Sequence, residues 1–333
     1  MVAFALVLIL LYISSLFGGN GIKQFDKAKI EPLRGVLAVI IILHHIYLSV
    51  GYEFLSQFKS WGAIVVSIFL FVSGYGLSKS LTEKGTKYLD SFLFKRVFLG
   101  ILLPFIVVVV CQIILNGEAA TQDIIGVLKN NGERWFIVAI LFLYTSFYVL
   151  TKYCSTKYLE LFIGCATTIF VLIATNLDLG RCWYISIWAF LSGLIYSKIE
   201  NSLIERSQSK SSVKYLAVPL LMLLIGISYI LGSKFSQLTI ICYSIVYAII
   251  PVMFSLLCSS LRVEVLGHSH LLMFLSKISY EVYLCHGVVI LYLMHIAGIV
   301  ENRTIFTSLT LLLTVVFAWI VKLITCKAVQ LIR

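Results

Sequence analysis

An arginine and two adjacent histidines share one apolar stretch, which runs from residue 33 to residue 46. Arg34 stands near its start, and His45 lies eleven residues further on. At about 100° per residue, these positions make three helical turns plus about 20°, so both side chains project from one face, about 16 Å apart along the axis. His44 points about 80° away and is the lesser partner. Histidine exchanges a proton near neutral pH, as a general base must, and arginine binds phosphates and carboxylates.

A structural explanation of the same residues is that the histidine bonds to a neighbouring helix and Arg34 reaches the lipid headgroups. The paired histidines and the shared face favour the functional explanation.

A second polar stretch, at residues 279–286, lies in a late apolar run. Glu281 is about one turn into that run and needs a cation, for which Arg34, Lys95 and Arg96 are the candidates. His286 lies deeper, at a level comparable to His45. Ionisable groups inside a membrane are costly, so each of them marks a candidate functional position.

Three other polar groups also have ordinary structural explanations. The segment from Ser73 to Tyr75 ends an apolar run, and Gly74 there permits close helix approach. Lys95 and Arg96 open the next run, where membrane orientation alone accounts for them. Trp135 opens a middle run and is typical of an anchor at the membrane interface.

The elements that position these residues must be membrane-spanning helices. The chain has 333 residues, of which 60% are hydrophobic and 12% are charged. A soluble domain carries about 25% charged residues, so this composition excludes a water-soluble globular protein, and it equally excludes a disordered chain. The net charge of +11 is therefore tested first as membrane orientation rather than as a nucleic-acid footprint, and we expect no nucleic-acid partner.

Eleven stretches are long and apolar enough to cross a bilayer as helices, which needs about 20 residues each. We therefore predict an all-α, polytopic membrane helix bundle. The predicted spans are 2–18, 35–52, 61–79, 92–115, 135–151, 158–176, 182–198, 214–232, 238–260, 277–297 and 304–326. The first, Val2 to Phe17, lacks the preceding positive charge of a secretory signal and is expected to stay as an additional N-terminal span.

The distribution of basic residues predicts the orientation of the bundle. Of the 26 Lys and Arg residues, 20 lie in the connections after spans one, three, five, seven and nine and at the C-terminal end, and 6 lie in the others. Cytoplasmic connections carry the excess of Lys and Arg. We therefore predict an N-terminus outside and a C-terminus in the cytoplasm.

The connections leave no room for a separate soluble domain, so residues 1–333 are predicted to form a single transmembrane domain. The eight cysteines are scattered without a metal-binding or disulfide spacing. His268 and His270 lack further ligands nearby, and we expect no metal site.

Taken together, these residues resemble the acyltransferase-3 family of bacterial integral-membrane O-acyltransferases. The family's Arg, ten residues, then His is matched by Arg34 and His45. Four further elements match in order, and the resemblance covers about residues 34–286. They are Ser73-Gly74-Tyr75; the basic pair Lys95 and Arg96 with Pro104; Trp135, Phe136 and Tyr144; and Ser279, Tyr280, Tyr283, Leu284 and His286.

The resemblance implies a multi-pass enzyme of the bacterial plasma (inner) membrane. It would transfer an acyl group, most often acetyl from acetyl-CoA, to a hydroxyl of a cell-surface or exported glycan, with no bound cofactor. His45 would be the catalytic base, assisted by Arg34. Arg34, Lys95, Arg96 and Ser73 would bind the donor. Supporting roles would fall to His44, Tyr75, Trp135, Glu281, Tyr283 and His286.

The chain departs from the family pattern in three ways. Its basic pair lacks a further arginine that many members carry, and its first span precedes the usual start. It also shows no esterase-like extracytoplasmic domain after the bundle, so transfer would be completed within the bundle or by a separate extracytoplasmic protein.

The alternative is a transporter or flippase of a lipid-linked or acylated saccharide, because intramembrane His and Glu also serve proton-coupled transport. Such proteins often contain repeats with broken, Pro/Gly-rich helices. This chain has four prolines and no evident repeat, which favours the acyltransferase.

Overall fold

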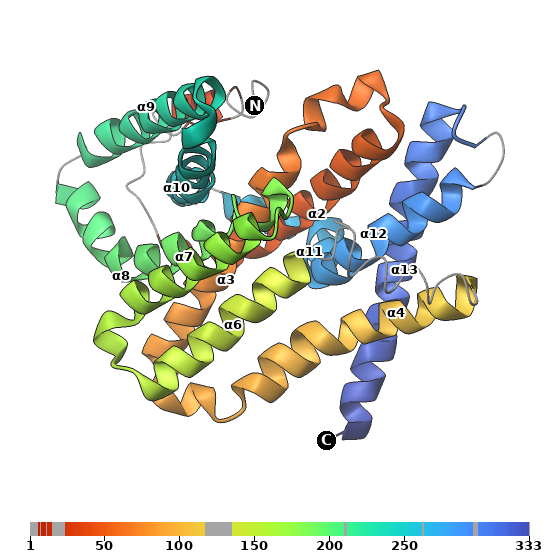
Figure 1. Cartoon of the computed structure of the whole chain (residues 1–333), viewed down its shortest axis with the longest axis horizontal. Coiled ribbons are helices and arrows are strands. Elements are labelled where there is room, and N and C mark those ends of the chain that lie inside the picture. The colour runs from red at the N-terminus through yellow and green to blue at the C-terminus, as the bar shows by residue number, and fades with distance from the viewer. Residues whose placement is uncertain are drawn as a thin grey trace. The chain divides into compact units, whose positions relative to one another are not determined.

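The computed structural model is built of helices in every part of the chain that it describes, and no strand occurs there. It describes residues 6, 8–10, 12–14, 24–116, 135–209, 212–261, 263–295 and 299–332. The longer helices (Figure 1) are α2 (Lys27–Val50), α3 (Trp61–Lys84), the π-helix η3 (Leu93–Leu102), α4 (Leu103–Asn116), α6 (Trp135–Tyr153), α7 (Leu159–Asn176), α8 (Trp188–Ser209), α9 (Ser212–Lys234), α10 (Thr239–Ser260), α11 (His270–Lys277), α12 (Ser279–Met294) and α13 (Arg303–Ile332). Short 3-10 turns are η1 (Glu53–Phe58), η2 (Gly85–Leu89), η4 (Thr156–Tyr158), η5 (Arg181–Trp183), η6 (Ser236–Leu238) and η7 (Val263–His268).

The helices confirm the predicted all-α, polytopic membrane fold. Within the described residues, nine helical segments are long and apolar enough to cross a membrane, or ten if the bent pair α11 and α12 forms one span. Each corresponds to one of the ten predicted spans from 35–52 onwards. The first predicted span, 2–18, lies mostly outside the described residues. The orientation of the bundle stays a prediction.

Among the elements that differ from the predicted runs are α2, α8 and α12. α2 begins at Lys27, eight residues early, because the Asp26 carboxylate accepts a hydrogen bond from the Lys29 backbone N–H at 3.2 Å and caps the helix. α8 continues to Ser209 through a stretch predicted to be a connector, so Glu200 lies on a helix. α12 is preceded by α11, and the two helices are bent by 78° around Ile278.

The chain forms two compact units. The first comprises Met1–Ile30, Ala63–Asp90 and Ser146–His268, and the second comprises Glu31–Gly62, Ser91–Thr145 and Ser269–Arg333. Three of the five boundaries between them fall within α2, α3 and α6, and the other two lie between consecutive helices. That residues 1–333 make a single domain stays a prediction.

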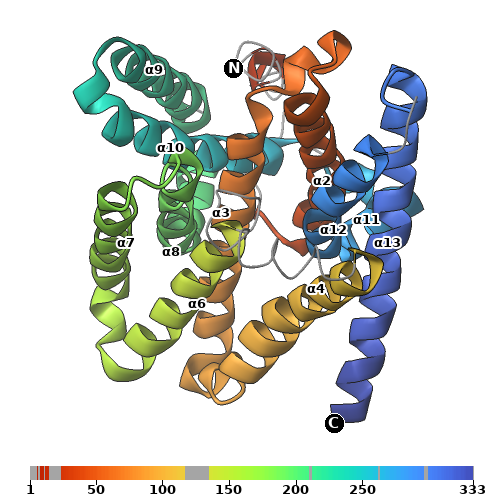
Figure 2. The same cartoon turned by 45° about the vertical axis from the view of Figure 1, so that its right-hand side comes forward.

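Each unit is held together by helices that pack along their lengths. In the first unit, α10 packs on α9 and α8, and α7 packs on α8. In the second unit, α12 packs on α13 and α4, and these helices lie side by side in Figures 1 and 2. Lipid is as apolar as the side chains, so helices in a membrane associate through close packing rather than hydrophobic burial.

Two glycines make a close helix contact in the first unit. A Cβ atom on Gly74 of α3 would collide with the Phe190 carbonyl of α8, and one on Gly193 of α8 would collide with the Phe71 carbonyl of α3. The two backbones therefore touch from both sides. Gly74 of the Ser-Gly-Tyr element has a structural task, as its residue type alone predicts.

We expect Gly193→Ala to destabilise the protein. The added methyl meets backbone that cannot rotate away, and such overpacking costs about 1–3 kcal/mol. The measurement is the thermal unfolding midpoint of purified protein in detergent. Gly76→Ala is the matched control, because a Cβ there meets nothing within 4 Å. Equal midpoints for the two variants would contradict the proposed contact.

Candidate functional site

Three histidines lie together in the second unit. The rings of His45 on α2 and His286 on α12 have centroids 4.5 Å apart, with their planes inclined by 51°. The His44 ring is 5.0 Å from the His45 ring. His286 is fully buried, and His44 and His45 are partly buried. The sequence predicts that His45 and His286 lie at a comparable level, and in the structure their rings are direct neighbours.

His44 is fixed by the backbone around it. Its Nδ1 is 2.9 Å from the Phe58 carbonyl oxygen, which can only accept, so Nδ1 donates. On the other side of the ring, a Cβ on Gly62 would overlap its Nε2 atom. The His44 ring, fixed in this way, lies edge-on to the His45 ring.

Arg34 stands at the other end of the same helix face. α2 is unbroken from Lys27 to Val50, so Arg34 and His45 keep the predicted separation of about 16 Å. The Arg34 guanidinium donates a hydrogen bond to Ser279 Oγ, the first residue of α12, at 2.9 Å. Glu31 and Glu281 attract the same guanidinium electrostatically. This bond joins the first and the last of the sequence elements that carry the family resemblance.

The contact is close because α2 approaches α11 at a glycine. A Cβ on Gly35 would overlap the Leu272 carbonyl oxygen. The α11 backbone is in turn started by Ser269, whose Oγ accepts a hydrogen bond from the Leu272 N–H. Gly35, the residue after Arg34, therefore packs directly against α11, the short helix that precedes the bend.

Glu281 takes its direct ion pair from a residue that the sequence did not indicate. Its Oε1 is 2.9 Å from Lys322 Nζ of α13, whereas Arg34, Lys95 and Arg96 were the predicted candidates. Arg34, one of those candidates, attracts Glu281 electrostatically without pairing with it directly. Lys322 was missed because it counts among the basic residues of the C-terminal end, although α13 continues beyond it to Ile332. Glu281 is almost fully buried, and its Oε2 has no hydrogen-bond partner among the described residues.

Aromatic rings connect the histidines to the start of α6. Tyr283 is 5.6 Å from His286 and 4.9 Å from Phe136, measured between ring centroids. Phe136 lies edge-on to Trp135 at 6.1 Å. The middle and late sequence elements therefore meet next to the histidines, although about 150 residues separate them along the chain.

Lys95 and Arg96 lie on the π-helix η3, and both are exposed. Within the same unit, η3 is joined to α12 by the Tyr280 hydroxyl, which donates to the Ile101 carbonyl at 3.0 Å. Their expected contact with a donor stays a prediction. In the described part of the chain, no group of three or more His, Cys, Asp or Glu residues is arranged to hold a metal ion.

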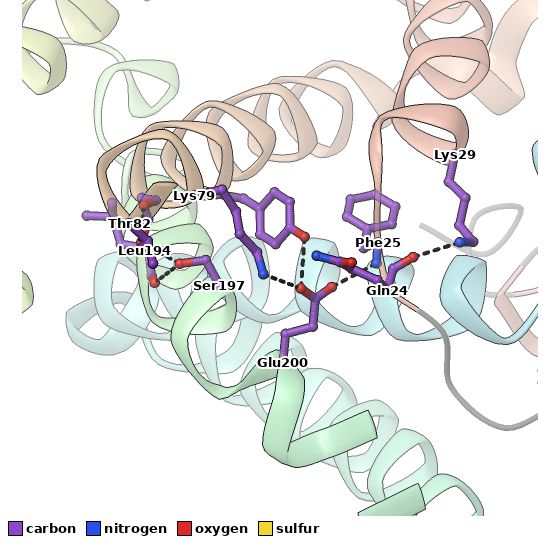
Figure 3. Close-up of polar contacts among 10 residues, drawn as sticks. Gln24, Phe25, Lys29, Lys79, Thr82, Leu194, Ser197 and Glu200 are labelled. Carbon is purple, nitrogen blue, oxygen red and sulfur yellow. Dashed lines mark hydrogen bonds and ion pairs between the residues drawn. The ribbon is translucent and has the colours of Figure 1, made fainter. Parts of the chain in front are cut away.

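The first unit contains a polar cluster around a carboxylate that the sequence did not indicate. Glu200 of α8 is fully buried, and three donors converge on it (Figure 3). They are the Phe25 backbone N–H at 2.7 Å, the Tyr75 hydroxyl at 2.9 Å and Lys79 Nζ at 2.8 Å. Tyr75 thus binds the carboxylate, whereas Ser73 lies partly buried on the same helix α3.

The same cluster holds the chain that enters α2. Lys29 is 4% exposed and donates from Nζ to the Gln24 carbonyl at 2.6 Å. Figure 3 shows Gln24 and Phe25 between Lys29 and Glu200. The signal that could have revealed Glu200 was its place at the end of an apolar run, which is unusual for a residue in a solvated connector.

A comparison with protein families agrees with these observations. The fold is that of a multi-pass membrane protein. Its clustered histidines are of a residue type that can transfer protons. A model of an acyltransferase domain matches residues 27–323. The chain therefore belongs to the acyltransferase-3 family and is a membrane acyltransferase. Searches of curated proteins and of solved structures gave no significant match.

We expect Glu200→Ala to unfold the first unit at a lower temperature, because it leaves Lys79 and the Phe25 N–H without their acceptor. Breaking a buried pair from one side costs about 3–5 kcal/mol. The Lys79 side chain is 20% exposed, so we expect a value near the lower end.

The control is Glu205→Ala on the same helix, where the side chain is exposed. Thermal unfolding in detergent is measured for both variants. An unfolding midpoint that Glu200→Ala leaves unchanged would show that the cluster does not hold the unit together.

Proposed function

We propose that this membrane acyltransferase transfers an acetyl group from acetyl-CoA to a hydroxyl of a cell-surface or exported glycan, in the bacterial inner membrane. The observation that carries the proposal is the arrangement on α2. Arg34 and His45 share one helix face, and the ring of His45 lies close to those of both His44 and His286. A proton acceptor and an anion-binding group thus stand about 16 Å apart on one rigid helix.

That separation suits the donor. The phosphates of CoA lie at one end of a long, flexible pantetheine arm, and the thioester lies at the other. In the proposed complex Arg34 binds a phosphate through charge-assisted hydrogen bonds, together with the exposed Lys95 or Arg96 of the same unit. The thioester then reaches the level of His45. The expected donor contact of Ser73, which belongs to the first unit, stays a prediction.

In the proposed reaction, His45 takes the proton of the acceptor hydroxyl. The hydroxyl oxygen forms a bond to the acyl carbon, the carbon–sulfur bond breaks, and the CoA thiolate receives the proton that His45 holds. In this scheme His44, Trp135, Glu281, Tyr283 and His286 have supporting roles. Tyr75 binds Glu200 in the first unit, and its expected supporting role stays a prediction. A separate extracytoplasmic protein would be needed only where the final acceptor lies beyond the bundle's reach.

We expect His45→Ala to lower kcat for acetyl transfer by at least about 100-fold, since a general base contributes about 10²–10⁴. Purified protein is given labelled acetyl-CoA and surface glycan from cells that lack the gene, and acetylated glycan is quantified by mass spectrometry. The control is His295→Ala, which alters an exposed histidine after α12. Unchanged glycan acetylation by His45→Ala would contradict the proposed role of His45 as the general base.

We expect Arg34→Gln to weaken the use of the CoA phosphates in particular. Wild-type protein should prefer acetyl-CoA to acetyl-pantetheine, which lacks the nucleotide phosphates. Loss of a charge-assisted hydrogen bond costs about 1.5–3 kcal/mol, so that preference should shrink about 10-fold or more.

Lys277→Gln serves as the control because Lys277 is an exposed cation of the same unit. A preference for acetyl-CoA that survives unchanged in Arg34→Gln would show that Arg34 does not bind the phosphates.

A further inference from the structure

The ring contact between His45 and His286 carries an inference beyond the placement of the base. His286 is fully buried on α12, and its ring centroid lies 4.5 Å from that of His45. Burying a polar ring among apolar helices costs free energy, and such a residue usually has a functional role. Packing alone would be served by any apolar side chain of similar volume.

The tautomer of His286 is set by its own helix. Its Nδ1 is 3.3 Å from the Val282 carbonyl oxygen, one turn earlier. A carbonyl only accepts, so Nδ1 carries the proton and the lone pair of the neutral ring is on Nε2. His44 is held in the same manner by the Phe58 carbonyl. The His45 ring therefore has two neighbouring imidazoles, and in each of them the Nδ1–H donates to a backbone carbonyl.

We infer that His286 is a positioning residue for His45: it fixes the orientation of the His45 ring and stabilises the imidazolium that forms when His45 takes a proton. This inference rests on the proposed function. The acceptor O–H bond breaks, the His45 N–H bond forms, and the positive charge then lies against a neutral ring with a lone pair. In a site of low dielectric, such a contact stabilises a cation more than it would in water.

Other titratable or charged groups lie on the helices of the same unit. Among them are Arg34 and His44 of α2, Cys111 of α4, Tyr144 of α6, Lys277 of α11, Tyr280, Glu281, Tyr283 and Cys285 of α12, and Lys322 of α13. Glu281 and Lys322 are paired with each other, and Arg34 bonds to Ser279. His286 and His44 are the neighbouring imidazoles of the His45 ring.

The test is the pH dependence of acetyl transfer by His286→Phe and His286→Gln. Phe keeps a ring but has no lone pair, and Gln keeps an acceptor but has no ring. Without His286, the protonated form of His45 is less stable, so the acid limb of the rate profile should move to lower pH by about one unit in His286→Phe. The same loss should lower kcat about 10-fold, with KM for acetyl-CoA within about twofold of wild type.

His286→Gln should fall between wild type and His286→Phe, and it decides the question if His286→Phe fails to fold. His295→Phe is the control, because His295 is exposed at the end of α12. An acid limb that stays in place in the folded variants, or a loss that appears mainly in KM, overturns the inference. Activity that survives His45→Ala would instead overturn the proposed base. An inactive His45→Ala beside unshifted His286 variants would overturn the inference alone.

Discussion

A polar group buried among lipid-facing helices must find its partner within the protein, since the hydrocarbon core offers no water. Both buried carboxylates discussed above meet this constraint with a lysine that remains partly exposed. Glu200 binds Lys79 in the first unit, and Glu281 binds Lys322 in the second. Each pair joins helices that are distant in the chain, so satisfying the charge also fixes which helices pack together.

Backbone carbonyls fulfil the same constraint for the histidines. The Nδ1 atoms of His44 and His286 both point to carbonyl oxygens, those of Phe58 and Val282. Glycines make room for such contacts, as Gly62 does beside the His44 ring. The site is therefore ordered by main-chain atoms, which are less mobile than long side chains, and its geometry is a property of the helices themselves.

The sequence predicted the spans and the depth of their polar residues, because hydropathy and the helical repeat are local properties. Arg34 and His45 could be placed on one face from their spacing alone. The partner helix could not be found in this way, since which face of α12 meets α2 depends on packing between distant segments. Glu200 and Lys322 were missed for a related reason. Glu200 fell in a predicted connection, whereas α8 extends further than its apolar run. Lys322 fell near the end of the predicted span 304–326, where its charge was explained by membrane orientation alone.

α2 and α12 touch at two levels. Arg34 bonds to Ser279, and His45 contacts His286, seven residues further along α12. The two contacts are about 16 Å apart on α2 and about 10 Å apart on α12, and the long arginine side chain accommodates the difference. Because α12 is a single stiff rod between them, a turn of that rod about its axis displaces both contacts together. The position of the Arg34 guanidinium and that of the His45 imidazole are therefore coupled through α12. A movement of one contact is transmitted to the other along a single helix, with no loop between them.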